Sequence, residues 1–214
     1  GETPTAFAKE NNMAGSDVQA TLIEAAVADP NGISVSAAVG NNASLVIGGA
    51  LASGGAVTFD EPRNVTITSA GNDSGISFTV TGTDVDGTAQ TESITGANAD
   101  IATGSSTFAT VTAIAAVGNP AGNVEAGSGT AVKATVFAGR CRLRGLYAVN
   151  TATGGKISFR ETSETGTVRM QFNTVSNANT TEYPDIPDEG LLCKNGAYVT
   201  YSSETMSSLT VFFN

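Results

Sequence analysis

The stretch RNVTITSAGNDSGISFTVTGTDVDGTAQTESIT, residues 63–95, decides the fold class of this 214-residue chain. Every second residue is apolar in two of its runs, which contain Val65 and Ile67, and then Ile76, Phe78 and Val80. Such alternation is typical of strands with one buried and one solvated face. Turn residues separate the runs at 70–75 and at 83–88, where Asp86-Gly87 suits a tight hairpin. The stretch therefore predicts a three-stranded antiparallel meander.

Short alternating segments continue on both sides of this stretch. They cover residues 33–39, 107–117, 138–149, 156–161, 167–172, 197–201 and 209–214. About seven short strands at intervals of roughly 8–12 residues in the C-terminal part favour a sandwich or jelly roll. Val211 and Phe213, in the last strand, are expected in a core or an interface. The segments 96–104 and 118–130, rich in small and turn residues, are expected to be irregular. The fold class that we predict is all-β, with two β-sandwich or jelly-roll-like domains.

The N-terminal region differs from the strand pattern. Residues 1–17 have few apolar side chains and predict an arm that needs a partner to become ordered. Over 17–28, a short helix is predicted, with apolar positions on one face and a stop at Asp29–Gly32; a β-rich neighbourhood could instead draw these residues into a strand. The predicted domains are an arm with this helix at 1–30, an acidic β domain at 31–130 and a C-terminal sandwich at 131–214.

Charge is distributed unevenly along the chain, whose net charge is −10. Residues 1–132 carry thirteen acids and two cations, a net of −11, whereas residues 133–214 carry eight cations and seven acids, a net of +1. An acidic first part is a poor match for nucleic acid or anionic lipid, and it could serve solubility or meet a basic partner surface. No apolar run approaches the roughly 18 residues that cross a bilayer, and no signal peptide is expected.

The residues that most often perform catalysis or bind metals are scarce. Histidine and tryptophan are absent, and there are two cysteines, Cys141 and Cys193. Two cysteines make neither a disulfide framework nor a zinc site. We expect free thiols in a reducing compartment, although the two could pair if their strands are neighbours. We therefore predict no enzyme, no catalytic or metal residues and no cofactor.

Two acidic clusters have both a functional and a structural interpretation. The run from Asp84 to Gly87 resembles the start of a calcium loop, but the fifth and twelfth positions are Thr88 and Thr95, so the ligand set fails and a hairpin turn is favoured. Asp185, Asp188 and Glu189 lie among prolines and favour a rigid turn over acid–base chemistry.

Arg140, Arg142 and Arg144 form the one basic stripe in the sequence. Alternate residues of a strand project to the same side, so the three guanidinium groups are expected in a row. Such a row could contact phosphate or an acidic protein edge, or it could be a solvated face that guards against aggregation. We take these three residues as the candidate partner contact, with nucleic acid disfavoured for lack of aromatic residues.

Two passages resemble known modules. PRNVTITSAGNDSGISFTVTGTDVDGTAQTESITG followed by STFATVTAIAAVG resembles a module of small structural proteins of tailed bacteriophages. RCRLRGLYAVNTATGGKISFRETSETGTVRMQF followed by IPDEGLLCKNGAYVTY and SLTVFF resembles a second such module. The resemblance covers most of residues 55–214 and transfers no site residues.

The resemblance implies a virion protein, assembled in the host cytoplasm. Its expected role is capsid decoration or cement, which stabilises the head by binding across subunits of the major capsid protein. A homotrimer is expected, because decoration proteins of this style often occupy threefold positions. The alternatives are a tail, fibre or adaptor component, or a sandwich that binds host glycans. No nucleic acid and no membrane are expected as partners.

Overall fold

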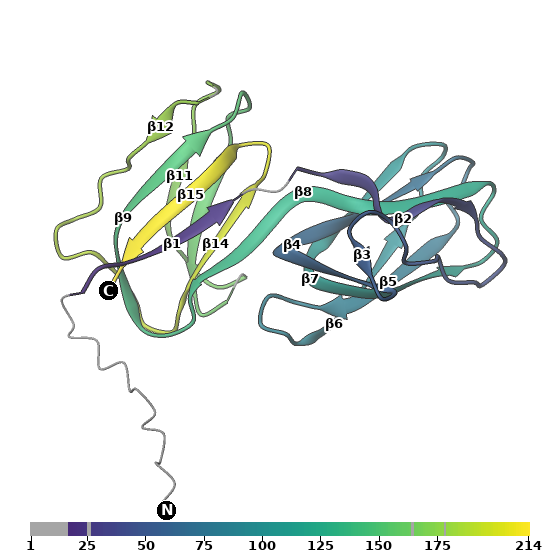
Figure 1. Ribbon diagram of the computed structural model, residues 1–214, viewed down its shortest axis with the longest axis horizontal. Helices are drawn as coiled ribbons and strands as arrows, with labels where there is room; N and C mark the ends of the chain where they lie inside the picture. Colours follow the sequence, from purple (N-terminus) through teal and green to yellow (C-terminus); the bar gives the residue numbers. More distant parts are fainter. Residues whose placement is uncertain (1–16, 25–26, 164, 178) are drawn as a thin grey trace, which may run out of the picture.

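The computed structural model describes residues 17–24, 27–163, 165–177 and 179–214, and the arm predicted at 1–17 lies almost wholly outside them. The described residues contain strands and no helix, which confirms the all-β prediction. The strands form two lobes that lie side by side along the long axis of the molecule (Figure 1). We call them the first lobe and the second lobe.

Each lobe draws on distant parts of the chain. The first lobe comprises β2 (Asp29–Ala38), β3 (Ala52–Ser53), β4 (Ala56–Ser69), β5 (Ser77–Thr83), β6 (Ala89–Thr95), β7 (Ile101–Val117) and the first part of β8 (Asn123–Phe137). The second lobe comprises the rest of β8, β1 (Gln19–Glu24), β9 (Cys141–Asn150), β10 (Lys156–Glu161), β11 (Val168–Asn173), β12 (Thr181–Glu182), β13 (Leu191–Cys193), β14 (Ala197–Ser202) and β15 (Met206–Phe213).

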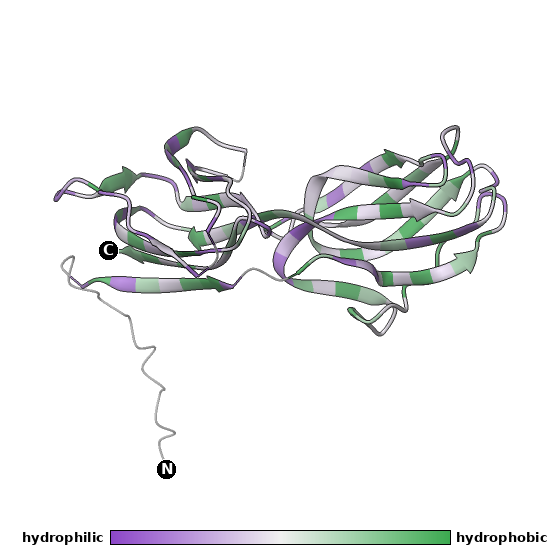
Figure 2. Ribbon diagram, turned by 90° about the horizontal axis from the view of Figure 1, so that it is seen from above, coloured by the Kyte–Doolittle hydropathy of each residue, from purple (hydrophilic) through white to green (hydrophobic). Residues whose placement is uncertain are grey.

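Two sheets contain all of these strands. A ten-stranded sheet has the order β11-β10-β14-β8-β4-β7-β5-β6, with β2 on β8 and β3 on β4. A five-stranded sheet has the order β1-β15-β9-β12, with β13 on β9. In the second lobe the five-stranded sheet packs on the β8, β14, β10 part of the larger sheet, and Val211 and Phe213 are buried in that core, as predicted. Apolar and polar residues alternate along strands of both lobes (Figure 2).

Strand β8 passes through both lobes without a break. Its inward residues Val124 and Ala126 belong to the core of the first lobe, and Val132, Ala134 and Val136 belong to that of the second. The same strand pairs with β2 and β4 in its first part and with β14 in its second. The two cores therefore divide on β8 between residues 126 and 132.

The prediction of an irregular segment at 118–130 is wrong from Asn123 onward. Glycines made this part of β8 look like a loop, but the packing explains them. A Cβ at Gly127 would lie 2.0 Å from the carbonyl oxygen of Asp29, and one at Gly129 would lie 2.5 Å from the Asn64 side-chain oxygen. Here glycine permits close approach of neighbouring chain segments inside a strand. Similarly, Ile101–Gly104, also expected to be irregular, is the start of β7.

The three-stranded meander predicted for 63–95 is also wrong in its first connection. β5 and β6 form the expected hairpin, with Ser77 opposite Thr95 and Thr83 opposite Ala89. β7, however, lies between β4 and β5 and pairs with both. The 17-residue β7 is long enough to border β4 with its first part and β5 with its second. Hydrogen bonding to β7 thus replaces the local pairing of β4 with β5.

The helix predicted over 17–28 is wrong for the described part, because Gln19–Glu24 is strand β1. β1 pairs antiparallel with β15, from Gln19 opposite Phe213 to Glu24 opposite Ser208. Ile23 is 1% exposed and belongs to the core of the second lobe, whereas Leu22 is 58% exposed. The edge of β15 supplies hydrogen-bond partners for the backbone of Gln19–Glu24. These residues therefore form a strand, although their apolar positions also fit one face of a helix.

This pairing generates a first prediction. We expect Ile23→Ala to lower the free energy of unfolding by about 2–4 kcal/mol, because it leaves a cavity in the second lobe. Leu22→Ala is the matched control, and its exposed side chain should change stability by less than about 0.5 kcal/mol. Urea denaturation of both variants measures the difference. Equal effects at the two positions would contradict the strand and its register.

Candidate interaction surfaces

The arginine stripe is divided between two structural roles. Arg142 and Arg144 lie on β9, on the side opposite the buried Cys141 and Leu143. Arg142 Nη1 donates to the Glu189 carbonyl oxygen at 2.9 Å, and Arg144 Nη1 donates to that of Asp188 at 2.7 Å. These two guanidinium groups therefore hold the backbone of the 188–190 turn against β9.

Arg140 lies just before β9 rather than on it, so the three guanidinium groups do not form a continuous strand row. Its side chain is exposed and lines a shallow hollow of about 260 Å³ together with Cys141, Arg142 and Asn214. Of the three arginines singled out in the sequence, Arg140 has the surroundings that best suit contact with a partner.

The acidic clusters form turns, as their structural interpretation predicts. The Asp84 carboxylate accepts hydrogen bonds from the backbone N–H of Asp86 at 3.0 Å and of Thr88 at 2.8 Å, and Gly87 has a φ of +77°. At 185–189, the N–H of Gly190 donates to the Pro187 carbonyl at 2.6 Å. Within the described ranges, no three His, Cys, Asp or Glu side chains gather as a metal site would require.

A polar network joins the lobes beside β8, a region that we call the waist. The Arg63 side chain is buried, and its Nε donates to the Gly129 carbonyl at 3.0 Å while Nη2 reaches Ser203 Oγ at 3.3 Å. The neighbouring Asn64 side chain accepts from the N–H of Ala131 at 2.9 Å. β4 is thereby tied both to β8 and to the β14–β15 turn.

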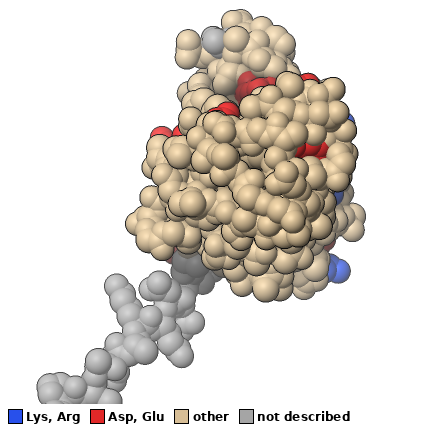
Figure 3. Space-filling view, turned by 90° about the vertical axis from the view of Figure 1, so that its right-hand side faces the viewer, with Lys and Arg blue, Asp and Glu red and all other residues tan. Residues whose placement is uncertain are grey.

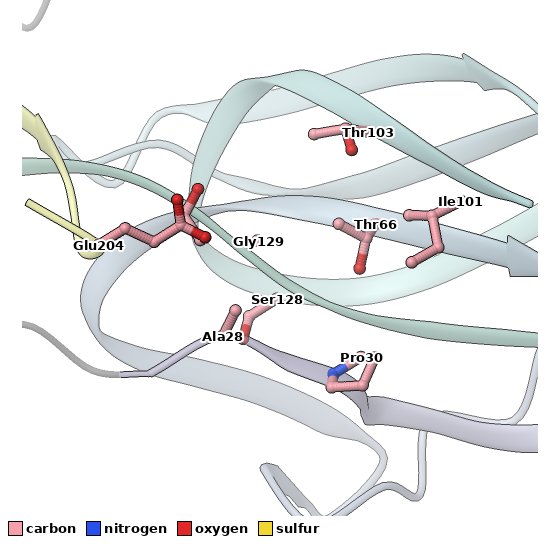
Figure 4. A pocket seen from close by; sticks show the side chains of 9 residues that line it. Ala28, Pro30, Thr66, Ile101, Thr103, Ser128, Gly129 and Glu204 are labelled. Atoms are coloured by element: carbon pink, nitrogen blue, oxygen red, sulfur yellow. The ribbon is translucent and has the colours of Figure 1, made fainter. Parts of the chain in front are cut away.

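A cavity of about 290 Å³ opens at the waist, between Glu204 on the second lobe and Thr66, Thr103 and Ile101 on the first (Figure 4). Ser128 and Gly129 of β8 and the segment from Ala28 to Pro30 complete its wall. The lining offers hydroxyl groups, one carboxylate and apolar surface. Such a lining can hold a small polar group.

An aromatic and apolar patch lies on the outer face of the five-stranded sheet. Leu22, Thr210 and Tyr147 share one cross-strand row. Tyr147 and Tyr183 contact each other edge to face, with ring centroids 5.0 Å apart, and Tyr183 is 65% exposed. We name Leu22, Tyr147, Tyr183 and Phe212 the tyrosine patch, because exposed tyrosines are common in binding surfaces.

The end of the first lobe is different. Seen from that end, it exposes mostly uncharged side chains, with a few acids and with cations only at the rim (Figure 3). The acidic charge of the first part of the chain is therefore not concentrated on this face.

Comparisons with known proteins found no match to this chain among family models, curated proteins or solved structures. No helix in the described part of the chain is long and apolar enough to cross a membrane.

The waist generates a pH prediction through Glu61. Burial, together with the nearby Asp60 carboxylate, raises the pKa of Glu61 to about 7 from an ordinary 4.5. The folded state thus disfavours the ionised form of Glu61. The contribution of this group to the free energy of unfolding should be most favourable below pH 4.5 and should be lost as the pH rises through 7.

Replacing Glu61 by Gln should remove that fall. The full shift corresponds to about 3 kcal/mol, and partial exposure of the side chain reduces our expectation to about 1 kcal/mol. Urea unfolding at pH 4.5 and at pH 8 measures the free energy of unfolding of both proteins. The variant should be more stable than the native protein only at pH 8. Glu204→Gln, an exposed carboxylate on the β14–β15 turn, is the control and should show no such gain.

The cysteines generate a further prediction. Cys141 and Cys193 are buried and free, and they lie directly opposite each other on β9 and β13. Hydrogen bonding to the Cys193 thiol and burial raise the pKa of Cys141, which lowers its reactivity. We expect both thiols to resist alkylation in the native protein and to react fully once it is denatured without reductant.

Intact mass after each treatment decides the redox state. Directly opposite residues of an antiparallel pair have Cα atoms about 4.5–5.5 Å apart, a spacing that a disulfide also accepts. A denatured protein that takes up alkylating reagent only after reduction would therefore reveal a disulfide and contradict the prediction of free thiols.

Proposed function

We propose that this protein is a non-enzymatic structural component of a tailed-bacteriophage virion, and that it decorates or cements the head by binding across subunits of the major capsid protein. The resemblance of residues 55–214 to phage structural modules supplies the virion context. The observation that carries the binding role is the waist: β8 and the buried Arg63 join two β lobes into one body with exposed sheet faces.

The physics of a cement protein suits such a body. A protein that binds only the assembled shell stabilises it by mass action. The interface needs about 600–1,000 Å² from each partner to be specific, which a sheet face can supply. Because β8 belongs to both lobes, two faces are presented at a defined separation, and little ordering free energy is lost on binding.

The homotrimer remains part of the proposal. Aromatic residues are few in the first part of the chain, and contacts with neighbouring copies would add burial to a modest core. Residues 1–17 precede β1, which begins at Gln19 on the edge of the second lobe. In the proposal this N-terminal stretch contacts an adjacent subunit or the shell.

A specific observation favours a second candidate, attachment to host glycans. Tyr183 is 65% exposed and contacts Tyr147 edge to face, and exposed aromatic rings stack on sugar rings. A tail or fibre location would suit this activity. Retention of the native protein on host-surface polysaccharide, lost in Tyr183→Ala, would favour attachment over cement.

Co-sedimentation tests the proposed function. The purified full-length protein is expected to pellet with shells assembled without it and not with isolated tails, and light scattering is expected to give a trimer at micromolar concentration. Deleting residues 1–17 leaves β1 whole, so circular dichroism should be unchanged while binding to shells weakens severalfold. Binding to tails alone would overturn the head location, and a monomer whose shell binding survives the deletion would overturn the trimer and the role of the N-terminal stretch.

A further inference from the structure

A basic hollow lies on the outer face of the second lobe, away from the arginine stripe. It occupies about 370 Å³ over β10, β14 and β8. Strand register puts Ser158, Thr200 and Lys133 in one cross-strand row. Lys156 and Arg160 lie two residues before and two residues after Ser158 on β10. Their side chains therefore project to the same face as that of Ser158. The opposite face of these strands, with Ile157, Phe159 and Val199, is the core.

The lining of the hollow is cationic and hydroxylated. Lys133, Lys156 and Arg160 are its charged members, and Ser158, Thr200 and Ser202 supply hydroxyl groups. Arg160 is held in place, since its Nη1 donates to the Gly166 carbonyl at 2.9 Å and its Nε reaches Thr200 Oγ1 at 3.4 Å. Three cations in one depression contrast with a protein of net charge −10.

Acidic groups stand at the ends of the hollow rather than inside it. Asp86, at the tip of the β5–β6 hairpin of the first lobe, accepts a hydrogen bond from Tyr198 at 3.4 Å. Tyr198 lies directly opposite Arg160 in the same cross-strand row. Glu204 is on the β14–β15 turn, two residues beyond Ser202. An occupant therefore meets cations in the centre and is bounded by carboxylates at two sides.

The spacing of the cations indicates the form of the occupant. Lys156 and Arg160 are four residues apart on one strand, which corresponds to about 13 Å. Lys133 lies two strands from Ser158, about 10 Å across the sheet. An extended chain that runs along β10 passes both Lys156 and Arg160, with Lys133 to one side. Side chains at every second position of an extended peptide recur at about 6.6 Å, so the spacing of Lys156 and Arg160 equals two such repeats.

The surroundings distinguish between kinds of linear polyanion. Single-stranded nucleic acid normally stacks its bases on aromatic side chains. Neither tyrosine near the hollow offers a free ring face: Tyr201, in its lining, and Tyr198, opposite Arg160, are each 6% exposed. Hydroxyl groups can donate to carboxylates and accept from a peptide backbone. An acidic polypeptide fits the charge, the spacing and the hydrogen-bonding groups.

We propose that the hollow formed by Lys133, Lys156 and Arg160 binds an extended acidic segment of a partner protein. The proposal specifies the chemistry of one partner contact. It rests on the proposed binding role of the protein but not on the identity of the partner. Charge complementarity of this kind contributes to association rate and specificity and weakens with salt.

The test uses the full-length protein and poly-L-glutamate as the probe. Binding measured by calorimetry at low salt should give a dissociation constant that rises steeply with added salt. Lys156→Glu should weaken binding about tenfold, whereas the matched control Lys194→Glu, an exposed lysine outside the hollow, should change it less than twofold. Circular dichroism confirms that both variants are folded.

The remaining outcomes each count against the inference. Equal losses in the two variants would mean non-specific attraction. Tight binding of oligo-deoxythymidylate or heparin with none of poly-L-glutamate would assign the hollow to nucleic acid or sulfated glycan. Salt-dependent self-association without probe, abolished by Lys156→Glu, would make a second copy the occupant. Because the probe contains no shell, poly-L-glutamate binding can fail while shell co-sedimentation succeeds, so failure here is distinguishable from failure of the proposed function.

Discussion

The waist is the constraint on which the rest of the molecule depends. A buried guanidinium is costly unless its donors are satisfied, and Arg63 meets this need with the Gly129 carbonyl at the point where β8 passes between the cores. Because alternate residues of one strand enter both cores, a register slip in β8 would turn both sets of apolar side chains outward. The two lobes therefore stabilise each other and are not independent domains joined by a flexible linker.

Fixed lobes make the outer sheet faces the natural places for binding. The tyrosine patch lies on the five-stranded sheet and the basic hollow on the opposite sheet of the same lobe. The two differ in chemistry, one aromatic and the other cationic. In the proposed bridging role, dissimilar faces would suit contact with two different surfaces, since identical ones favour self-pairing.

Local signals in the sequence predicted local structure, but they could not predict which strands pair across long distances in the sequence. The β5–β6 hairpin follows from Asp86-Gly87 and the alternation around Phe78, which act within a few residues. The insertion of β7 beside β4, and the pairing of β1 with β15, depend on partners far away in sequence. Leu22 and Ile23 suit a helix or a strand, and only the edge of β15 decides. Likewise, Arg142 and Arg144 looked available for a partner because the carbonyls that they bind are more than 40 residues away.

The pairing of β1 with β15 also sets the order of events during synthesis. The ribosome makes β1 long before its hydrogen-bond partner β15, since Gln19 pairs with Phe213. Pairing across nearly the whole chain is slow to form, because a long loop must close before any contact compensates for it. The first lobe has all its strands once β8 has emerged, so it can fold while the ribosome is still working. The second lobe cannot be completed until β15 has been made, and until then β1 and the edge of β9 that β15 will occupy lack this hydrogen-bond partner.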